Sequence, residues 1–273
     1  MSRATGLIRQ HPLVAFFVLA YAIAWAGWPL WAFGALAEPL FLPCGPLVAA
    51  LVVIAVTEGK AGLRVLGARM VRWRVGWVWW VVALGLPIAL VLVTALLMAI
   101  TGAPLSVFAQ LAWADLALLF GFYLINPLGG AFGEEPGWRG CALPYLQATR
   151  PALASALVLG LLVALWHLPL VMFGWLGPIG LLSTVAITVI YVWLFNRTGG
   201  SVLLTLVAHA VQDSFNFGSL GYAAPDLDRA EYLYCLVVVV AAALVLIDRT
   251  AWRVVPAAAT SRRAREGLAE HPH

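Results

Sequence analysis

The chain has 273 residues, of which 63% are hydrophobic and 10% are charged, and its net charge is +4. About half of the residues of an ordinary soluble domain are apolar, so this composition excludes such a domain and predicts an integral membrane protein. In a membrane protein the distribution of Lys and Arg matters more than their sum, and we expect no nucleic-acid partner. The three cysteines are far apart and form no CxxC pair, which argues against a disulfide framework or a thiolate zinc site.

Apolar runs of about twenty residues, the length of a helix that spans a bilayer, recur along almost the whole chain. We therefore predict one all-α, polytopic membrane domain over residues 1–248 and a basic, disordered cytoplasmic tail over 249–273. The eight expected spans lie at about 12–37, 40–56, 77–100, from 114 to beyond Gly137, 152–172, 178–195, 202–220 and 232–247. The first run resembles a signal peptide, but it is longer than the roughly 7–15 apolar residues of a secretory signal, so we interpret it as a span.

Basic and apolar residues alternate between positions 58 and 76. This pattern indicates an amphipathic segment that lies on an anionic leaflet, and a solvated basic loop is the alternative. All but one of the 16 Lys and Arg residues fall at the N-terminus, in alternate loops or in the tail, and the exception is Arg229. By the positive-inside rule, this asymmetry predicts a multi-pass protein of the cell membrane with both termini in the cytoplasm.

An unusual group of charges follows the fourth apolar run. Glu134, Glu135 and Arg139 lie within six residues, among glycines spaced four apart that would let a neighbouring element approach closely. In a helix Glu135 and Arg139 share a face, so that the guanidinium holds one carboxylate and leaves the other available. Charge at membrane depth is costly and marks a functional candidate. The simpler alternative is a helix end at the water interface.

Two histidines in apolar helices extend this group. His167 lies in the fifth run, and His209 lies four residues before Asp213 in the seventh, so His209 and Asp213 project from one helix face. If the fourth and fifth helices form a hairpin that turns near Arg150, Glu134 and His167 stand at nearly the same depth, because they are about equally far from the turn. Pro136 removes one helical hydrogen bond, and we expect a kink there.

A carboxylate and a neutral imidazole that converge in a wet pocket can activate a water molecule, either as a general-base pair or as ligands of a metal ion. A second histidine beside a carboxylate can support the oxyanion that forms during amide hydrolysis. The residue types therefore predict peptide-bond hydrolysis inside the membrane.

In this order the residues resemble the three motifs of the CPBP family of intramembrane proteases, also called the CAAX protease and bacteriocin-processing or Abi family. Its EExxxR motif is similar to Glu134-Glu135 with Arg139, and its HxxxN or HxxxD motif is similar to His209 with Asp213. The FxxxH motif ends at His167, with valine where the family usually has phenylalanine. The resemblance covers about residues 129–216.

The resemblance implies that Glu134 and His167 activate the hydrolytic water. It further implies that Glu135 and Arg139 stabilise the site, and that His209 with Asp213 supports the oxyanion or completes a metal site. Members of the family are described both as zinc metalloproteases and as metal-independent glutamate proteases, so a divalent metal held by Glu134, His167 and His209 and a metal-free site both stay open. The implied substrate is a membrane-associated peptide or a prenylated, CAAX-type protein tail.

Other polar groups receive simpler interpretations. Asn126, Gln212 and Asn216 can line the same cavity as hydrogen-bonding groups between helices. Cys141 has no histidine predicted beside it, so we interpret it as a packing residue. The competing functional class is a non-enzymatic immunity factor, scaffold or transporter, and a transporter should show a repeat symmetry that this sequence lacks.

Overall fold

A computed structural model describes residues 3–103, 111–222 and 224–253. Over these ranges the chain is helical and has no strand, which confirms the all-α prediction. Five stretches are long and apolar enough to cross a membrane, namely Pro12–Ala32, Trp77–Ile100, Trp113–Gln147, Ala152–Met172 and Gly180–Arg197. A multi-pass membrane protein is therefore supported, whereas the predicted count of eight spans is not confirmed.

The first five helices are α1 (Arg3–Gln10), α2 (Pro12–Ala24), α3 (Gly27–Ala32), α4 (Gly45–Thr57) and α5 (Gly59–Met70). The first predicted span is confirmed as the apolar stretch Pro12–Ala32, and within it the chain turns between α2 and α3. Pro29 explains the turn, since a proline ring clashes with the carbonyl four residues earlier, here that of Trp25. The basic segment 58–76 does contain a helix, α5.

The fourth predicted helix is interrupted. The chain continues through α6 (Trp77–Ile100), α7 (Trp113–Ile125), α8 (Gly130–Gly137), a π-helical turn (Trp138–Ala142) and α9 (Leu143–Gln147). The interruption falls before the glutamates, because Asn126 precedes Pro127 and adopts extended backbone. Pro136 lies inside α8, and the π-helical turn follows it directly.

The remaining helices are α10 (Ala152–Trp166), α11 (Leu168–Met172), α12 (Gly180–Arg197), α13 (Val202–Ser214), α14 (Asp226–Val245) and α15 (Arg249–Trp252). The fifth predicted span divides at His167, the seventh ends at Ser214 instead of near 220, and the eighth begins at Asp226 instead of Tyr232. The prediction that disorder begins at 249 was wrong for α15, because Ala251 is buried and its carbonyl accepts a hydrogen bond from Asn196. Residues 254–273 lie outside the described ranges.

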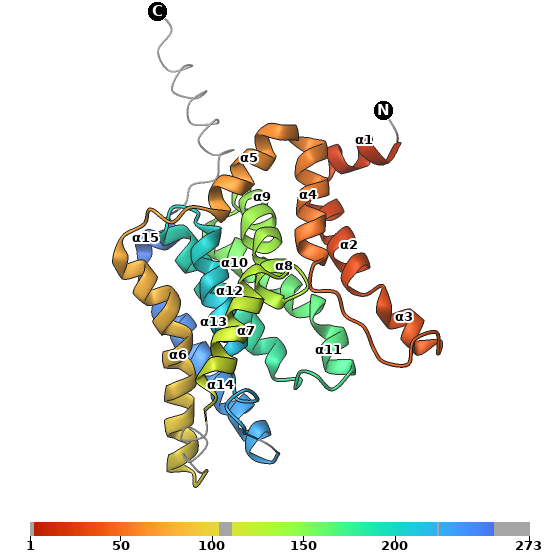
Figure 1. The fold of residues 1–273 in the computed structure, drawn as a ribbon. Coiled ribbons are helices and arrows are strands. Elements are labelled where there is room, and N and C mark those ends of the chain that lie inside the picture. Colours follow the sequence, from red (N-terminus) through yellow and green to blue (C-terminus); the bar gives the residue numbers. More distant parts are fainter. Residues whose placement is uncertain (1–2, 104–110, 223, 254–273) are drawn as a thin grey trace, which may run out of the picture.

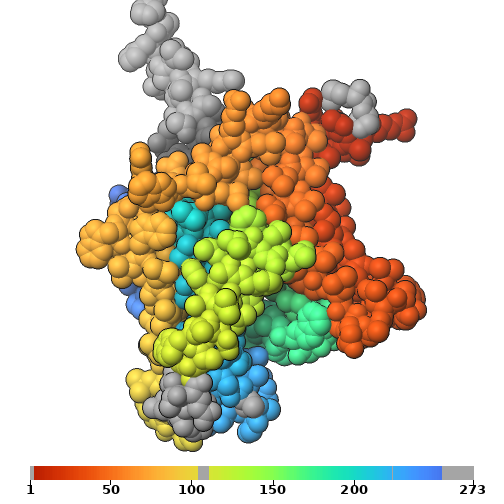
Figure 2. Space-filling view, viewed as in Figure 1, coloured from red at the N-terminus to blue at the C-terminus, as the bar shows by residue number. Residues whose placement is uncertain are grey.

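Helix α13 lies at the centre of the fold, in contact with α6, α7, α8 and α12 (Figure 1). The helices α10, α12 and α14 pack side by side, and α2 packs against α4. Helices α1, α5 and α15 lie toward the same end of the molecule (Figure 1). In the space-filling view, the atoms of α11 are visible between α7 and the N-terminal helices (Figure 2).

Candidate functional site

Close backbone packing fixes the helix that carries the two glutamates. A methyl group added to Gly133 would lie 2.7 Å from the Pro43 carbonyl oxygen, and one added to Gly137 would lie 2.5 Å from the Pro46 carbonyl carbon. Only glycine permits such contacts without displacement of the backbone. The predicted close approach is therefore confirmed, and the neighbouring element is the start of α4.

Glu135 lies in the interior, where its carboxylate contacts a guanidinium nitrogen and an imidazole nitrogen. Its Oε1 atom accepts hydrogen bonds from Arg139 Nη1 at 2.7 Å and from His209 Nδ1 at 2.9 Å. Glu135 is 0% exposed and Arg139 is 2% exposed. The guanidinium of Arg139 also lies over the ring of Tyr191, with 5.1 Å to the ring centroid. The pairing of Glu135 with Arg139 that the helical spacing predicted is confirmed.

His209 connects Glu135 to Asp213. Its Nδ1 atom bonds to Glu135, and its Nε2 atom lies 3.4 Å from Asp213 Oδ1. Carboxylates accept hydrogen bonds, so both contacts are satisfied together when both ring nitrogens carry a proton. Two carboxylates, one guanidinium and one imidazolium then make a neutral group, which is the arrangement that a low-dielectric interior favours. The Nε2 contact is longer than an ordinary hydrogen bond and leaves this donor only weakly engaged.

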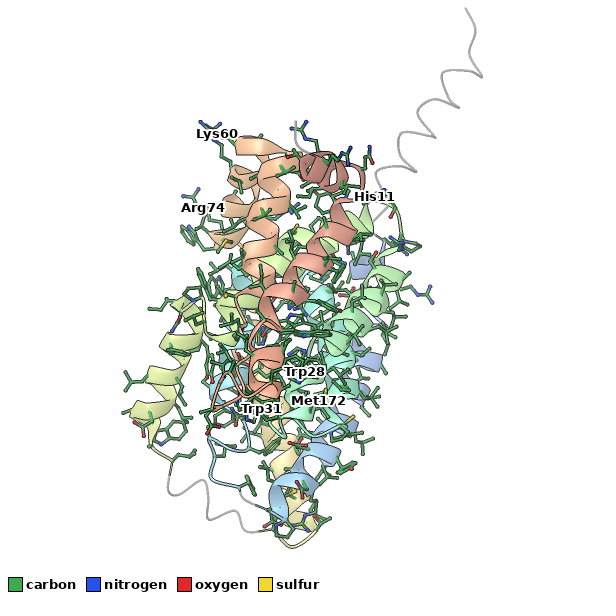
Figure 3. The ribbon with its side chains drawn as sticks, turned by 90° about the vertical axis from the view of Figure 1, so that its right-hand side faces the viewer. His11, Trp28, Trp31, Lys60, Arg74 and Met172 are labelled. Carbon is green, nitrogen blue, oxygen red and sulfur yellow. The ribbon has the colours of Figure 1, made fainter. Side chains whose placement is uncertain are left out.

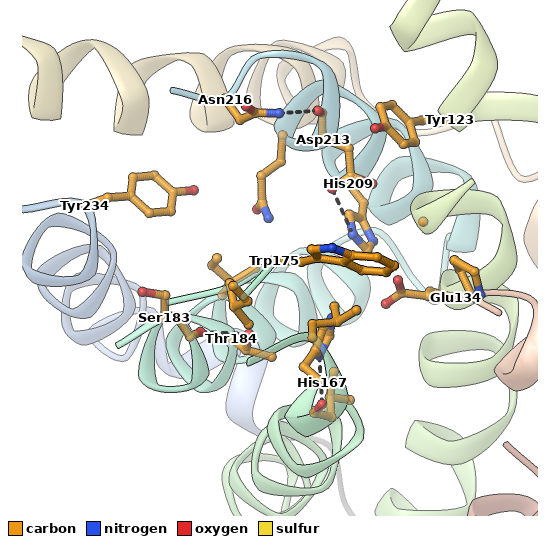
Figure 4. A pocket seen from close by; sticks show the side chains of 18 of the residues that line it. Tyr123, Glu134, His167, Trp175, Ser183, Thr184, His209, Asp213, Asn216 and Tyr234 are labelled. Atoms are coloured by element: carbon orange, nitrogen blue, oxygen red, sulfur yellow. Dashed lines mark hydrogen bonds and ion pairs between the residues drawn. The ribbon is translucent and has the colours of Figure 1, made fainter. Parts of the chain in front are cut away.

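Glu134 is held from one side and faces a cavity on the other (Figure 4). Its Oε2 atom accepts a hydrogen bond from Trp138 Nε1 at 3.2 Å. Among the described residues it forms no ion pair, in contrast to Glu135. Gly130 makes room for the neighbouring Asp213, since a methyl group there would lie 2.5 Å from Asp213 Oδ2, whereas its distance of 3.5 Å from Glu134 Oε1 is an ordinary contact. Glu134 therefore combines burial with one oxygen that is available to a molecule in the cavity.

His167 sits at the junction of α10 and α11. Pro169 accounts for this junction, because its ring prevents α10 from continuing. The Nδ1 atom of His167 lies 2.8 Å from the carbonyl oxygen of Val163. A carbonyl only accepts, so Nδ1 carries the proton, and the Nε2 atom of the neutral ring has a free lone pair. His167 lines the same cavity as Glu134, as the depth argument predicted.

The cavity has a volume of about 620 Å³ and is bordered by α7, α8, α10, α12, α13 and α14. Figure 4 shows Glu134 of α8, His209 of α13 and His167, at the junction of α10 and α11, directed into it. Its lining also includes Trp175, Tyr234 and Gln212, whose Oε1 atom accepts from Tyr191 at 2.8 Å. Of the three polar residues expected here, Gln212 and Asn216 line the cavity. Asn126 instead holds the turn before α8, where its Oδ1 atom accepts from Leu128 N.

The side chains as placed do not fit the metal site that the resemblance left open. Zinc needs ligands with free lone pairs, whereas both ring nitrogens of His209 contact carboxylates and act as donors. In the part of the chain that the structure describes, no three His, Cys, Asp or Glu side chains converge as a metal would require.

Sequence reasoning missed two residues that shape this site. Trp138 donates to Glu134, and Tyr191 covers Arg139. The four-residue spacing from Glu134 to Trp138 was a usable signal, because such pairs share a helix face. Nothing in the sequence indicated Tyr191, because its position depends on how α12 packs against α13.

The segment that builds most of this site matches a known family. Residues 113–215 match the family model described as Rce1-like, type II CAAX prenyl endopeptidase Rce1-like. A curated relative from Methanococcus maripaludis, CAAX prenyl protease 2, is 28% identical over 88 residues, which cover 28% of this chain and 32% of the relative. The match therefore spans about a third of that relative's length. These findings confirm the resemblance to the CAAX protease family.

Proposed function

We propose that the chain acts as a CAAX-type intramembrane protease and hydrolyses a peptide bond of a membrane-associated, prenylated substrate, because residues 113–215 match the family of such endopeptidases. We propose a glutamate-type mechanism in which Glu134 and His167 activate the water. The observation that carries the proposal is the placement of Glu134 on α8 and of His167 at the junction of α10 and α11, both at one cavity and each with an atom available to a bound water.

In the proposed reaction, the Glu134 carboxylate and the Nε2 lone pair of His167 orient a water molecule, and Glu134 takes one proton from it. The hydroxide oxygen bonds to the carbonyl carbon of the scissile amide, and the carbonyl electron pair moves onto oxygen. The tetrahedral intermediate then collapses, the carbon–nitrogen bond breaks, and the proton that Glu134 holds passes to the leaving amine. General-base assistance of this kind contributes about 10²–10⁴-fold to the rate.

The charged network on α8 and α13 would stabilise the intermediate. The Nε2–H donor of His209 is held only weakly by Asp213 at 3.4 Å, so it can turn toward the new oxyanion. Glu135 and Arg139 fix His209 from the other ring nitrogen and do not enter the reaction themselves. This division assigns the chemistry to Glu134 and His167, charge stabilisation to His209, and positioning to Glu135, Arg139 and Asp213.

The cavity also supports a substrate with a large apolar part. Phe41, Leu170, Leu176 and Ile187 line it, and Trp175 lies across it in Figure 4. An isoprenoid chain would bury its surface against such side chains, while the peptide amide reaches Glu134. We further propose that the protein acts in the cell membrane with both termini in the cytoplasm, which agrees with the basic residues on α1, on α5 and after α14.

The proposal is tested with the full chain purified in detergent and a fluorescent farnesylated CAAX peptide. Glu134→Gln and His167→Ala should each abolish cleavage, whereas Asp115→Asn, which changes an exposed carboxylate on α7, should leave the rate unchanged. Retained cleavage in both site variants would overturn the proposed chemistry. If the wild-type protein does not cleave the peptide either, the non-enzymatic scaffold becomes the better account.

Metal content separates the two mechanisms of hydrolysis. The proposal predicts active wild-type protein with far less than one zinc per chain by mass spectrometry, and the same rate after treatment with a chelator. Near-stoichiometric zinc that is lost in both Glu134→Gln and His167→Ala would contradict the glutamate-type mechanism and support a metalloprotease.

A further inference from the structure

A second hollow lies at the end of the molecule that carries α1, α5 and α15. It has a volume of about 450 Å³ and is bordered by α5, the end of α9 and the turn that joins α12 to α13. Among the described residues, none lines both this hollow and the cavity that contains Glu134. Arg69, Arg72 and Gln147 supply the long polar side chains of its wall. We call this hollow the basic cleft.

The charged residues that line the basic cleft are two arginines. Neither Arg69 nor Arg72 belongs to an ion pair among the described residues. Glu58 is the carboxylate that acts on Arg69 through its charge, and its Oε1 atom already accepts a hydrogen bond from Tyr145. Arg69 donates a hydrogen bond from Nη1 to the carbonyl oxygen of Gly140 at 3.0 Å, so other N–H donors of its guanidinium group stay available. Two such guanidinium groups suit an anion with several oxygen acceptors.

The opposite wall of the cleft is built to leave space in front of Arg69. Gly199 and Gly200 have φ values of +63° and +86°, a conformation that favours glycine. A methyl group on Gly200 would lie 3.9 Å from Arg69 Nε, so any longer side chain there would fill the space before the guanidinium. Gln147 is 8% exposed and donates through Nε2 to Asn196 Oδ1 at 3.1 Å, which fixes its amide at the cleft.

The position of the basic cleft relative to the membrane surface indicates which ligand is available to it. Arg72 lies five residues before α6, a 24-residue helix that is apolar enough to span the membrane. Trp73 and Trp77 beside it are exposed, as aromatic residues at a membrane interface are. Figure 3 shows Lys60 and Arg74 at the same end, away from Trp28 and Trp31. Phosphate groups of lipids occupy this level of a bilayer.

We propose that the basic cleft binds a phosphate group through Arg69 and Arg72, and that an anionic lipid headgroup supplies this group in the membrane. The inference is independent of the proposed peptidase activity. Bound phosphate would also tie α5 to the catalytic helix, because Arg69 contacts Gly140 of the π-helical turn and Leu66 packs directly on the same glycine. That turn follows Glu134 and Glu135 without a break.

The test measures binding of phosphatidylglycerol to the full chain in a zwitterionic detergent by native mass spectrometry. Arg72→Gln is compared with Arg64→Gln, which removes the same charge from an exposed position of α5 outside the cleft. Arg72→Gln removes one charge-assisted contact and should weaken binding about ten-fold. Arg64→Gln removes no contact with the ligand and should weaken binding by less than about two-fold. Melting temperatures of both variants in detergent establish that each remains folded.

A competition with inorganic phosphate distinguishes the two sources of the anion. Competition that is lost in Arg72→Gln would show that the cleft recognises phosphate itself. No competition, with lipid binding that still depends on Arg72, would show that it requires the headgroup attached to its lipid. Both results support the cleft as a site. Equal weakening by Arg64→Gln and Arg72→Gln, or no saturable binding of either probe, would overturn the proposal.

Discussion

Glu134 and Glu135 are adjacent in the sequence but occupy opposite environments. Glu135 is enclosed, and its Oε1 atom contacts both Arg139 and His209. Glu134 accepts a hydrogen bond from one neutral donor among the described residues, Trp138, and faces a cavity of about 620 Å³. A carboxylate held by two cationic partners loses its freedom to take a proton, whereas one with a weak partner keeps it. The comparison indicates that one glutamate reacts and the other positions the site.

The largest effect on catalysis should come from Glu134 and His167, which face the cavity. Glu134→Gln and His167→Asn should each lower kcat by about 10²–10⁴-fold, because each removes part of the group that activates the water. If both act on the same water, the double variant should lose little more than either single variant. Single-turnover cleavage assays measure these rates. Losses that multiply in the double variant would show that the two residues act in separate steps.

Changes to the buried pair of Glu135 and Arg139 should lower the free energy of unfolding. Arg139→Gln leaves Glu135 buried with one partner fewer, and breaking a buried ion pair in this way costs about 3–5 kcal/mol. Combining it with Glu135→Gln should recover part of that loss, since no uncompensated carboxylate remains. Thermal unfolding in detergent measures this coupling. A double variant that is less stable than the sum of the two single losses would contradict the assignment of the pair.

The next effect concerns the hydrogen bond that Trp138 donates to Glu134. Trp138→Phe keeps an aromatic ring but removes the Nε1 donor, and a hydrogen bond to a charged group is worth about 1.5–3 kcal/mol. We expect a roughly ten-fold fall in kcat with little change in KM, together with a change in the pH profile of kcat. A profile identical to that of the wild-type protein would mean that Trp138 serves packing alone.

The smallest effect concerns an ion pair of the same type at the surface. Asp248 lies 3.2 Å from Arg197 and accepts from Trp193, and this hydrogen bond, with smaller help from Arg197, holds the pKa of Asp248 below its ordinary value. Because the pKa of Asp248 is lower in the folded protein than in the unfolded chain, its carboxylate stabilises the fold at neutral pH. This stabilisation is lost as the pH falls through the pKa that Asp248 has in the folded protein. Asp248→Asn should therefore cost less than about 1 kcal/mol at pH 7 and nothing in acid. A loss as large as that of Arg139→Gln, measured by thermal unfolding across pH, would contradict the role given to burial.

The sequence predicted the site more completely than it predicted the helices. The spacing of Glu135 and Arg139 and that of His209 and Asp213 are local properties of a helix, so their pairing was predictable. The contact between His209 and Glu135 was not, because it depends on how α13 packs against α8. The breaks inside the first, fourth and fifth predicted spans follow from Pro29, Pro127 and Pro169, whose effect on the preceding backbone was available in the sequence.

The two glutamates offer the most direct test of the whole account. Glu134→Gln and Glu135→Gln change the same group at adjacent positions, so cleavage of the farnesylated peptide and the melting temperature are measured for both in one detergent. We expect Glu134→Gln to lose cleavage and keep the wild-type melting temperature, and Glu135→Gln to lower the melting temperature. The reverse pattern, with an active Glu134→Gln and a fully stable but inactive Glu135→Gln, would contradict this expectation.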